Sequence, residues 1–214
     1  MIVSNAALKV VYEDNHCIAV VKPHGLLVQG DATGDLCLMD QVKAYLKEKY
    51  NKPGDVFLGL VHRLDRPVSG IVIFGKTSKG AARLSEQFRN HTVEKMYRAV
   101  VEGCPEEKEG NVVLWLKKNE ATNHVTAFKK ETVGALRAEL HYRVLSSDGK
   151  RSEVEVIPKT GRPHQIRVSM QHLGCPIIGD KKYGAKTAFD GNIALVATGL
   201  SFNKVVGEER VNIQ

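Results

Sequence analysis

Apolar and polar residues alternate along the first third of the chain in runs that predict short strands and one helix. Two β-branched runs flank a Glu-Asp-Asn turn within residues 8–22, which predicts a hairpin. Residues 36–50 carry apolar side chains at helical spacing, with Asp35 placed to cap the helix and a Pro-Gly pair placed to end it. Apolar runs at 56–61 and 71–74 predict strands on either side of a charged loop.

The rest of the chain predicts two further helices among many strands. We expect helices at 78–90 and at 160–173, the second with Pro163 in its first turn and Gly174 just past its end. We expect strands at 93–102, near 111–118, 122–129, 136–146 and 151–157, and last at 193–203. The consecutive middle strands predict a meander. No repeat or long linker interrupts this order, so we expect one domain over residues 1–214.

Composition places the chain among ordinary globular proteins and excludes several classes. Apolar residues make up 43% and charged residues 26%, and no apolar run approaches the roughly 20 residues of a membrane helix. The N-terminus lacks the pattern of an export signal, so we expect a cytoplasmic protein without a membrane partner. The four cysteines form no C-x-x-C pair, and we expect them to be reduced and buried rather than zinc ligands.

The net charge of +7 favours a polyanionic partner without requiring one. Aromatic residues are only 6% of the chain, which argues against a protein that grips single strands mainly by stacking bases on exposed rings. Charge and composition alone therefore leave the partner open.

Residues 61–70, VHRLDRPVSG, crowd unusual charge into one short polar interruption. Two plain explanations apply to these ten residues: Asp65 starts a turn that continues through Pro67 and Gly70, or Arg63 and Asp65 pair on the surface. Loops between strands are also where site residues are often held. The segment alone does not decide between structure and function.

Residues 70–77, GIVIFGKT, satisfy the phosphate-loop pattern G-x-x-x-x-G-K-[ST]. A phosphate loop needs a tight, permissive turn at its four middle positions, because consecutive backbone N–H groups must wrap the anion. Ile-Val-Ile-Phe is strand-forming instead and resists that turn. We therefore predict a strand here, and no nucleotide cofactor.

The charged segment and the residues after it, VHRLDRPVSGIVIFGKT, resemble the catalytic motif of the RluA-type RNA pseudouridine synthases. Other blocks resemble that family in the same order, from about residue 10 to about residue 200: VVYEDNHCIAVVKPHGLLVQ, VEKMYRAVVEG and GRPHQIRVSMQHLGCPIIGDKKYG. The resemblance implies an α+β fold, with a mixed, mostly antiparallel central sheet, flanking helices and a central RNA-binding cleft. Several members carry a small RNA-binding module ahead of the catalytic domain, and we expect none here, since about nine residues precede the hairpin.

The resemblance implies that the chain isomerises uridine to pseudouridine in ribosomal RNA or tRNA, without a cofactor or metal. A carboxylate suits this reaction because it can attack or stabilise an electron-deficient sugar carbon, and the family motif places it at Asp65. Residue types leave open whether Asp65 attacks C1′ or abstracts a sugar proton to give a glycal-type intermediate. A catalytically silent RNA-binding protein on the same scaffold is the alternative.

Two further residues receive catalytic roles from the family match. A carboxylate in a closed pocket tends to take up a proton unless a cation lies beside it, and Arg167 stands at the family's salt-bridging position. Tyr97 is expected to contact the uracil face and to help remove the C5 proton, which requires a neighbour because a phenol is ordinarily protonated at neutral pH. Without the family match, Arg167 reads as an exposed helix residue and Tyr97 as an ordinary strand aromatic.

Four residues are expected around the substrate. Arg63 is placed to fill the gap left by a flipped uridine, with a phosphate contact as the fallback. Ile166 is expected to line the pocket beneath the base, a role that plain core packing would equally explain. His62 and His164 are expected as hydrogen-bonding members of the site, since neither has the neighbours of a metal ligand or a general base.

The sequence departs from the family pattern at three places, where the family more usually shows Thr, Thr and His: Val68, Pro163 and Val196. None of them removes a residue assigned to the chemistry. The loss of His at 196 affects the expected C-terminal wall of the site and the choice of substrate. We expect a monomer.

Overall fold

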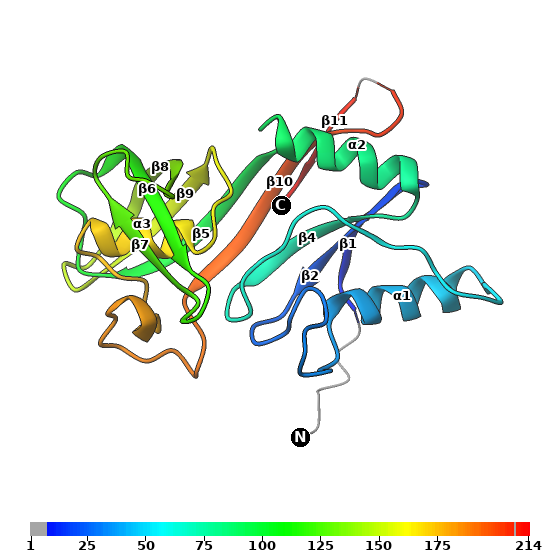
Figure 1. Ribbon diagram of the computed structural model, residues 1–214, viewed down its shortest axis with the longest axis horizontal. Helices are drawn as coiled ribbons and strands as arrows, with labels where there is room; N and C mark the ends of the chain where they lie inside the picture. The colour runs from blue at the N-terminus through cyan, green and yellow to red at the C-terminus, as the bar shows by residue number, and fades with distance from the viewer. Residues whose placement is uncertain (1–7, 208) are drawn as a thin grey trace. The chain divides into compact units, whose positions relative to one another are not determined.

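The computed structural model describes residues 8–207 and 209–214 (Figure 1). Its internal contacts form two compact units: unit 1 comprises Met1–Val93 with Ser201–Ile213, and unit 2 comprises Glu94–Leu200 with Gln214. The prediction of a single catalytic domain stays a prediction. The first seven residues, part of the N-terminal segment in which we expected no export signal, lie outside the described residues.

Unit 1 is built on three antiparallel strands in the order β1 (Val10–Glu13), β2 (Cys17–Lys22) and β4 (Ser69–Gly75). The short strand β3 (Gly59–Leu60) pairs with the end of β4. The predicted hairpin and the predicted strand at 71–74 are confirmed by β1, β2 and β4. The apolar side chains of β2 and β4 are mostly buried in the core of this unit, whereas those of β1 are half-buried.

The C-terminal strands differ from the prediction. Strand β10 (Leu195–Asn203) begins in unit 2 and ends in unit 1, where a further strand, β11 (Arg210–Ile213), pairs with it. The expectation that β10 is the last strand is therefore wrong. Half of the four residues of β11 are polar and, within this strand, only Ile213 is buried, so the pattern carries little strand signal.

Two helices accompany the strands of unit 1 and lie on either side of them in Figure 1. Helix α1 (Leu38–Lys49) buries Leu38, Val42 and Leu46 at the predicted spacing. Its cap is Cys37 rather than the predicted Asp35, because the Cys37 N–H donates to the side chain of Asp40 in a capping box. Helix α2 (Ser78–Arg89) matches the predicted 78–90 helix and packs against β3 and β4.

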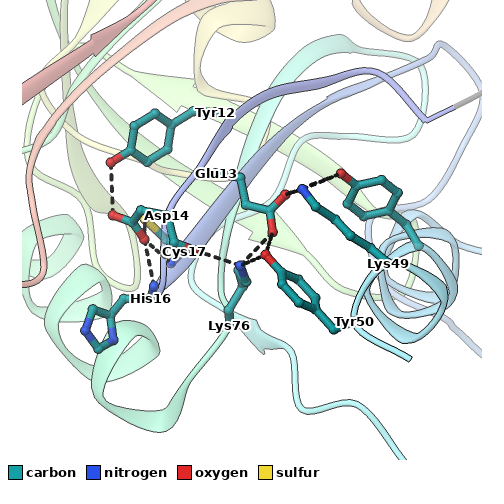
Figure 2. A network of polar contacts seen from close by, with 9 residues as sticks. Tyr12, Glu13, Asp14, His16, Cys17, Lys49, Tyr50 and Lys76 are labelled. Atoms are coloured by element: carbon teal, nitrogen blue, oxygen red, sulfur yellow. Dashed lines mark hydrogen bonds and ion pairs between the residues drawn. The ribbon is translucent and has the colours of Figure 1, made fainter. Parts of the chain in front are cut away.

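The segment that matches the phosphate-loop pattern is a strand, as predicted. Its apolar positions are buried in β4, and Thr77 caps α2 by accepting from the N–H of Gly80. Figure 2 shows that Lys76 instead joins a polar network: its Nζ lies 2.6 Å from Glu13 Oε1 and 3.1 Å from the Tyr50 hydroxyl. The lysine of the pattern therefore ties the first hairpin to the end of α1.

Unit 2 holds five antiparallel strands in the order β5 (Glu94–Glu102), β9 (Arg151–Pro158), β8 (Leu136–Ser147), β6 (Glu109–Asn119) and β7 (His124–Phe128). All predicted strands are present, but the meander is wrong because β8 pairs with β6 rather than with β7. Strand β6 thus has a partner on each side, with β7 at one edge and β8 at the other.

Helix α3 (Gln165–His172) packs against β6 and β7 and begins later than the predicted 160–173 helix. His164 has a left-handed backbone, with φ of 51°, and Gln165 Oε1 accepts from the N–H of Arg162 and the hydroxyl of Thr160. These bonds close residues 160–164, Pro163 included, into a turn ahead of the helix. Gly174, with φ of 75°, follows the helix end as predicted.

The short 3-10 helix η1 (Lys181–Tyr183) completes the elements used below. All four cysteines are free thiols, and three are buried as expected, whereas Cys104 is exposed, which contradicts the expectation for that residue. No helix in the part of the chain that the structure describes has the length and apolar character needed to cross a bilayer.

Candidate active site

The charged segment of residues 61–68 is a loop between β3 and β4, as predicted. Within it, Leu64 is buried, Arg63 is exposed and Asp65 is half-buried. The N–H of Val68 donates to the carbonyl oxygen of Asp65 at 3.0 Å, which closes a tight turn around the carboxylate residue. The family departure at Val68 is therefore a buried apolar anchor of this turn.

Lys22 lies beneath the same loop and is fully buried, with an exposed fraction of 0%. Its Nζ donates to three carbonyl oxygens, those of Pro23 at 3.0 Å, Leu26 at 2.7 Å and Arg66 at 3.0 Å. Burial lowers the pKa of Lys22 to about 8, while the negative charge of Asp65 opposes that shift. The ammonium thus holds the backbone of the loop and places a positive charge close to Asp65.

A second set of contacts joins the loop to residues 23–27. The N–H of Gly25 donates to the carbonyl of Arg66 at 2.9 Å, and the Arg66 Nε donates back to the carbonyl of Gly25 at 3.0 Å. The His24 ring nitrogen Nδ1 lies 2.8 Å from the carbonyl of Pro67. Two loops far apart in sequence are therefore joined by hydrogen bonds to backbone carbonyl groups.

Just after strand β3, the side chain of His62 takes the place of a strand carbonyl as hydrogen-bond acceptor. Gly59 and Leu60 pair with Gly75 and Phe74, so a continued ladder would bring the carbonyl of residue 61 to the N–H of Ile73. Instead, the Ile73 N–H donates to His62 Nε2 at 3.0 Å. Since a backbone N–H can only donate, Nε2 carries no proton, and His62 is neutral with its hydrogen on Nδ1.

The His62 ring is also held from the side by helix α2. It stacks on Phe88, with 4.6 Å between ring centroids and 18° between planes. This is a hydrogen-bonding role in the scaffold of the loop, of the kind expected for His62. Its contact with substrate stays a prediction.

In unit 2 the site is built around Arg167, in the first turn of α3. Its Nε lies 2.7 Å from Asp180 Oδ2 and its Nη2 lies 2.8 Å from Asp180 Oδ1, a two-point ion pair. Arg167 is 6% exposed and Asp180 is 1% exposed. The guanidinium carbon also lies 5.0 Å from the centre of the Tyr183 ring. The predicted exposed-helix alternative for Arg167 is therefore wrong.

Tyr183 connects this ion pair to His164. Its hydroxyl oxygen accepts from the N–H of Val125 at 3.1 Å and lies 2.6 Å from His164 Nδ1. The left-handed backbone at His164 turns its ring toward Tyr183 just before α3 begins. Ile166, in the first turn of α3, is buried, and Tyr97 lies half-buried on β5.

The predicted site residues fall into two groups. Unit 1 contains His62, Arg63 and Asp65, and unit 2 contains the remaining ones: Tyr97, His164, Ile166 and Arg167. The predicted pairing of Asp65 with Arg167 stays a prediction. The described residues contain no group of three His, Cys, Asp or Glu side chains placed to hold a metal ion.

Sequence reasoning missed three residues that organise these groups, namely Lys22, Asp180 and Tyr183. Each lies inside a block that carries the family resemblance: Lys22 in VVKPHG, and the other two in GDKKYG. Their presence in those blocks was the available signal. A lysine reads as a surface residue from sequence, because burial of its ammonium depends on distant carbonyl groups.

A model of the RNA pseudouridylate synthase family matches residues 16–172. The chain belongs to this family. Its match contains all the residues predicted for catalysis, and the α+β fold predicted from the family resemblance is confirmed.

Two curated relatives and one solved structure illustrate the similarity of this RNA pseudouridylate synthase family member to known proteins. The chain is 35% identical over 207 residues to ribosomal large subunit pseudouridine synthase C of Rickettsia bellii, covering 95% of this chain and 66% of the relative. It is 36% identical over 188 residues to tRNA pseudouridine synthase C of Vibrio cholerae, covering 83% and 74%. The structure of human RNA pseudouridylate synthase domain containing 4 superposes with a TM-score of 0.81 at 25% identity, covering 96% of this chain and 87% of that one.

The chain spans only 56% to 66% of the length of the first ribosomal relatives that it matches.

Proposed function

We propose that this protein isomerises a uridine to pseudouridine in structured ribosomal RNA or tRNA, with Asp65 as the catalytic carboxylate. The observation that carries the proposal is the position of Asp65. It lies in the family motif, on a loop whose backbone is held by Lys22 and Gly25, with the Lys22 charge beneath it. A carboxylate on a fixed loop is preorganised for attack on, or stabilisation of, an electron-deficient carbon.

The reaction is balanced without any other reactant. The bond from N1 to C1′ breaks, the base turns while bound, and a bond from C5 to C1′ forms. The proton on C5 is then lost, and N1 gains one. Asp65 acts either as the nucleophile at C1′ or as the base that abstracts a sugar proton, and Tyr97 serves the removal of the C5 proton.

The remaining residues support binding and charge in this proposal. Arg167, held by two bonds to Asp180, is the cation that the family motif assigns to keep the Asp65 carboxylate ionised, and Ile166 is assigned to the base pocket. Arg63 is exposed on the loop, and its side chain occupies the gap that the flipped uridine leaves in the base stack. The relatives' names point to ribosomal RNA and tRNA as the two substrate classes.

The test uses RNA from cells that lack this gene. Purified protein is incubated with their total RNA, and new pseudouridines are mapped by chemical labelling and sequencing. We expect one or a few sites to be restored by the wild type and lost with Asp65→Asn, at a rate lower by at least about a thousandfold. Restoration by Asp65→Asn at the wild-type rate would remove Asp65 from the chemistry.

The alternative of a silent RNA-binding protein makes the opposite prediction. In that case the wild type binds the RNA but restores no pseudouridine. A wild-type protein that restores a site in ribosomal RNA but none in tRNA, or the reverse, identifies the substrate class.

A further inference from the structure

Lys22 and Lys95 are both desolvated, but their hydrogen bonding differs. Lys22 has three carbonyl acceptors and the charge of Asp65 nearby. Lys95 has one weak bond, from its Nζ to the carbonyl of Thr160 at 3.4 Å. No Asp or Glu among the described residues forms an ion pair with Lys95, and burial alone lowers its pKa. An ammonium with three donors is expected to have more partners than this.

The position of Lys95 on β5 links it to the predicted site. Successive side chains of a strand point to opposite faces, so Lys95 and Tyr97 share a face. That face continues into the buried residues Ala99 and Val101, which shows that it is the covered one. The next cation along the strand, Arg98, points to the other face, where it pairs with Glu153.

The surroundings of Lys95 also belong to the site. Its Nζ contacts Thr160 and lies beside Gly161, in the turn that leads into α3 and Arg167. Residues two apart on a strand lie about 7 Å from each other along its axis. A nucleotide whose base rests on Tyr97 can therefore extend its backbone to the Lys95 ammonium.

We propose that Lys95 binds a backbone phosphate of the RNA next to the target uridine. The inference rests on the proposed function, because it takes Tyr97 as the residue that contacts the base. An anionic oxygen satisfies the open donors of the ammonium and compensates its charge, whereas a neutral uracil carbonyl would satisfy one donor and leave the charge uncompensated. Lys95 is thus a binding residue held in a desolvated position, ready for a phosphate.

The first test measures the salt dependence of binding. A fluorescein-labelled RNA hairpin with uridines in its loop is titrated with the wild type, Lys95→Gln, Lys95→Arg and the control Arg98→Gln, over a range of salt concentrations. Loss of one phosphate contact reduces the slope of log Kd against log salt by about 1. We expect that reduction, with weaker binding at low salt, for Lys95→Gln alone. The proposal is overturned if Lys95→Gln and Arg98→Gln behave alike.

The second test separates binding from structure. A lysine that held the fold would lower the melting temperature when replaced. Lys95→Met should instead raise the melting temperature, because it removes a desolvated charge that lacks a compensating anion in the free protein. A lower melting temperature together with an unchanged salt slope would show a structural role and refute the proposal.

Failure of the proposed function gives a different result. If the wild type binds the hairpin with a Lys95-dependent slope but restores no pseudouridine to RNA from the deletion strain, the Lys95 contact stands and the enzymatic proposal falls. If pseudouridine is restored equally by the wild type and Lys95→Gln, with equal slopes, the Lys95 contact falls and the enzymatic proposal stands.

Discussion

In unit 1 the Asp65 loop is held through its backbone, whereas in unit 2 Arg167 is held through its own side chain. The carbonyl of Arg66 accepts from Lys22 and from Gly25, so these bonds act on the backbone of the loop. The guanidinium of Arg167, in contrast, donates two of its N–H groups to the Asp180 carboxylate. A substitution at Asp65 therefore keeps the backbone bonds that position its loop, whereas a substitution at Arg167 removes the bonds that position its side chain.

The difference also concerns charge. Arg167 already has a buried carboxylate partner, so the pair of Arg167 and Asp180 is formally neutral. Lys22 is bonded only to carbonyl oxygens, and Asp65 is the one acidic group that shifts its pKa. We therefore expect Lys22 to supply net positive charge near Asp65, and Arg167 to supply oriented hydrogen bonds.

The largest effect is expected in unit 2. Arg167→Met leaves the Asp180 carboxylate buried without its partner, which should lower the free energy of unfolding by about 3–5 kcal/mol. Urea denaturation measures the change. The control is Arg98→Met, which breaks an exposed pair with Glu153 and should cost about 1 kcal/mol or less. Equal losses in the two variants would show that Asp180 does not depend on Arg167.

In unit 1 the largest effect should come from Lys22. Lys22→Met leaves three carbonyl groups without their donor, and we expect a loss of about 2 kcal/mol at pH 7 together with slower isomerisation. If the variant keeps wild-type stability and rate, the three carbonyl bonds do not position the loop.

The difference in stability between the wild type and Lys22→Met is expected to depend on pH. The folded pKa of Lys22, about 8, lies below the ordinary value of 10.5, so the unfolded chain binds more protons between these two values. The stability of the wild type relative to Lys22→Met should therefore rise from about pH 8 to pH 10.5, by up to about 1.4 kcal/mol per pH unit. A flat difference across that window would contradict the burial of the charge.

A smaller effect is expected for His62, whose Nε2 replaces a strand carbonyl. His62→Leu leaves the Ile73 N–H without an acceptor and should cost about 1 kcal/mol. His62→Gln restores an acceptor oxygen at similar reach and should recover most of the loss in stability and rate. Nitrogen NMR shifts of the imidazole in the wild type should show the hydrogen on Nδ1. A protonated Nε2 would contradict the bond to Ile73.

The smallest effect is expected for Arg66→Ala, which tests whether the side chain or the backbone of Arg66 holds the loop. Arg66→Ala removes an exposed pair with Asp35, in which the two side chains are 53% and 52% exposed, and the bond from Arg66 Nε to the Gly25 carbonyl. It keeps the Arg66 carbonyl that Lys22 and Gly25 use. We expect a change of about 0.5 kcal/mol in thermal denaturation. A loss as large as that of Lys22→Met would mean that the side chain, rather than the backbone, holds the loop.

Much of the fold was predictable because its signals are local. The β-branched runs of β2 and β4, the helical spacing in α1 and α2, and the Gly174 helix end each depend on a few neighbouring residues. The same holds for the strand at 71–74, where side-chain shape excluded a phosphate loop despite the matching letters. The candidate residues of the site came from the motif order of the family rather than from periodicity.

The errors share one physical cause. The pairing of β8 with β6, the added strand β11 and the late start of α3 each depend on partners that lie far away in the chain or on bonds that a sequence pattern does not encode. The cap of α1 likewise depends on specific contacts. Cys37 forms a capping box with Asp40, whereas the carboxylate of Asp35 pairs with Arg66.

The sequence by itself determined the family and most of the elements, and it named the candidate reactive side chains, since these follow from residue types in short order. Only the tertiary structure decided that Lys22 is enclosed by carbonyls, that His62 is a neutral acceptor and that Arg167 is paired with Asp180. The reason is that desolvation and hydrogen-bond geometry arise when distant backbone groups surround a side chain, and neither is a property of the residue alone.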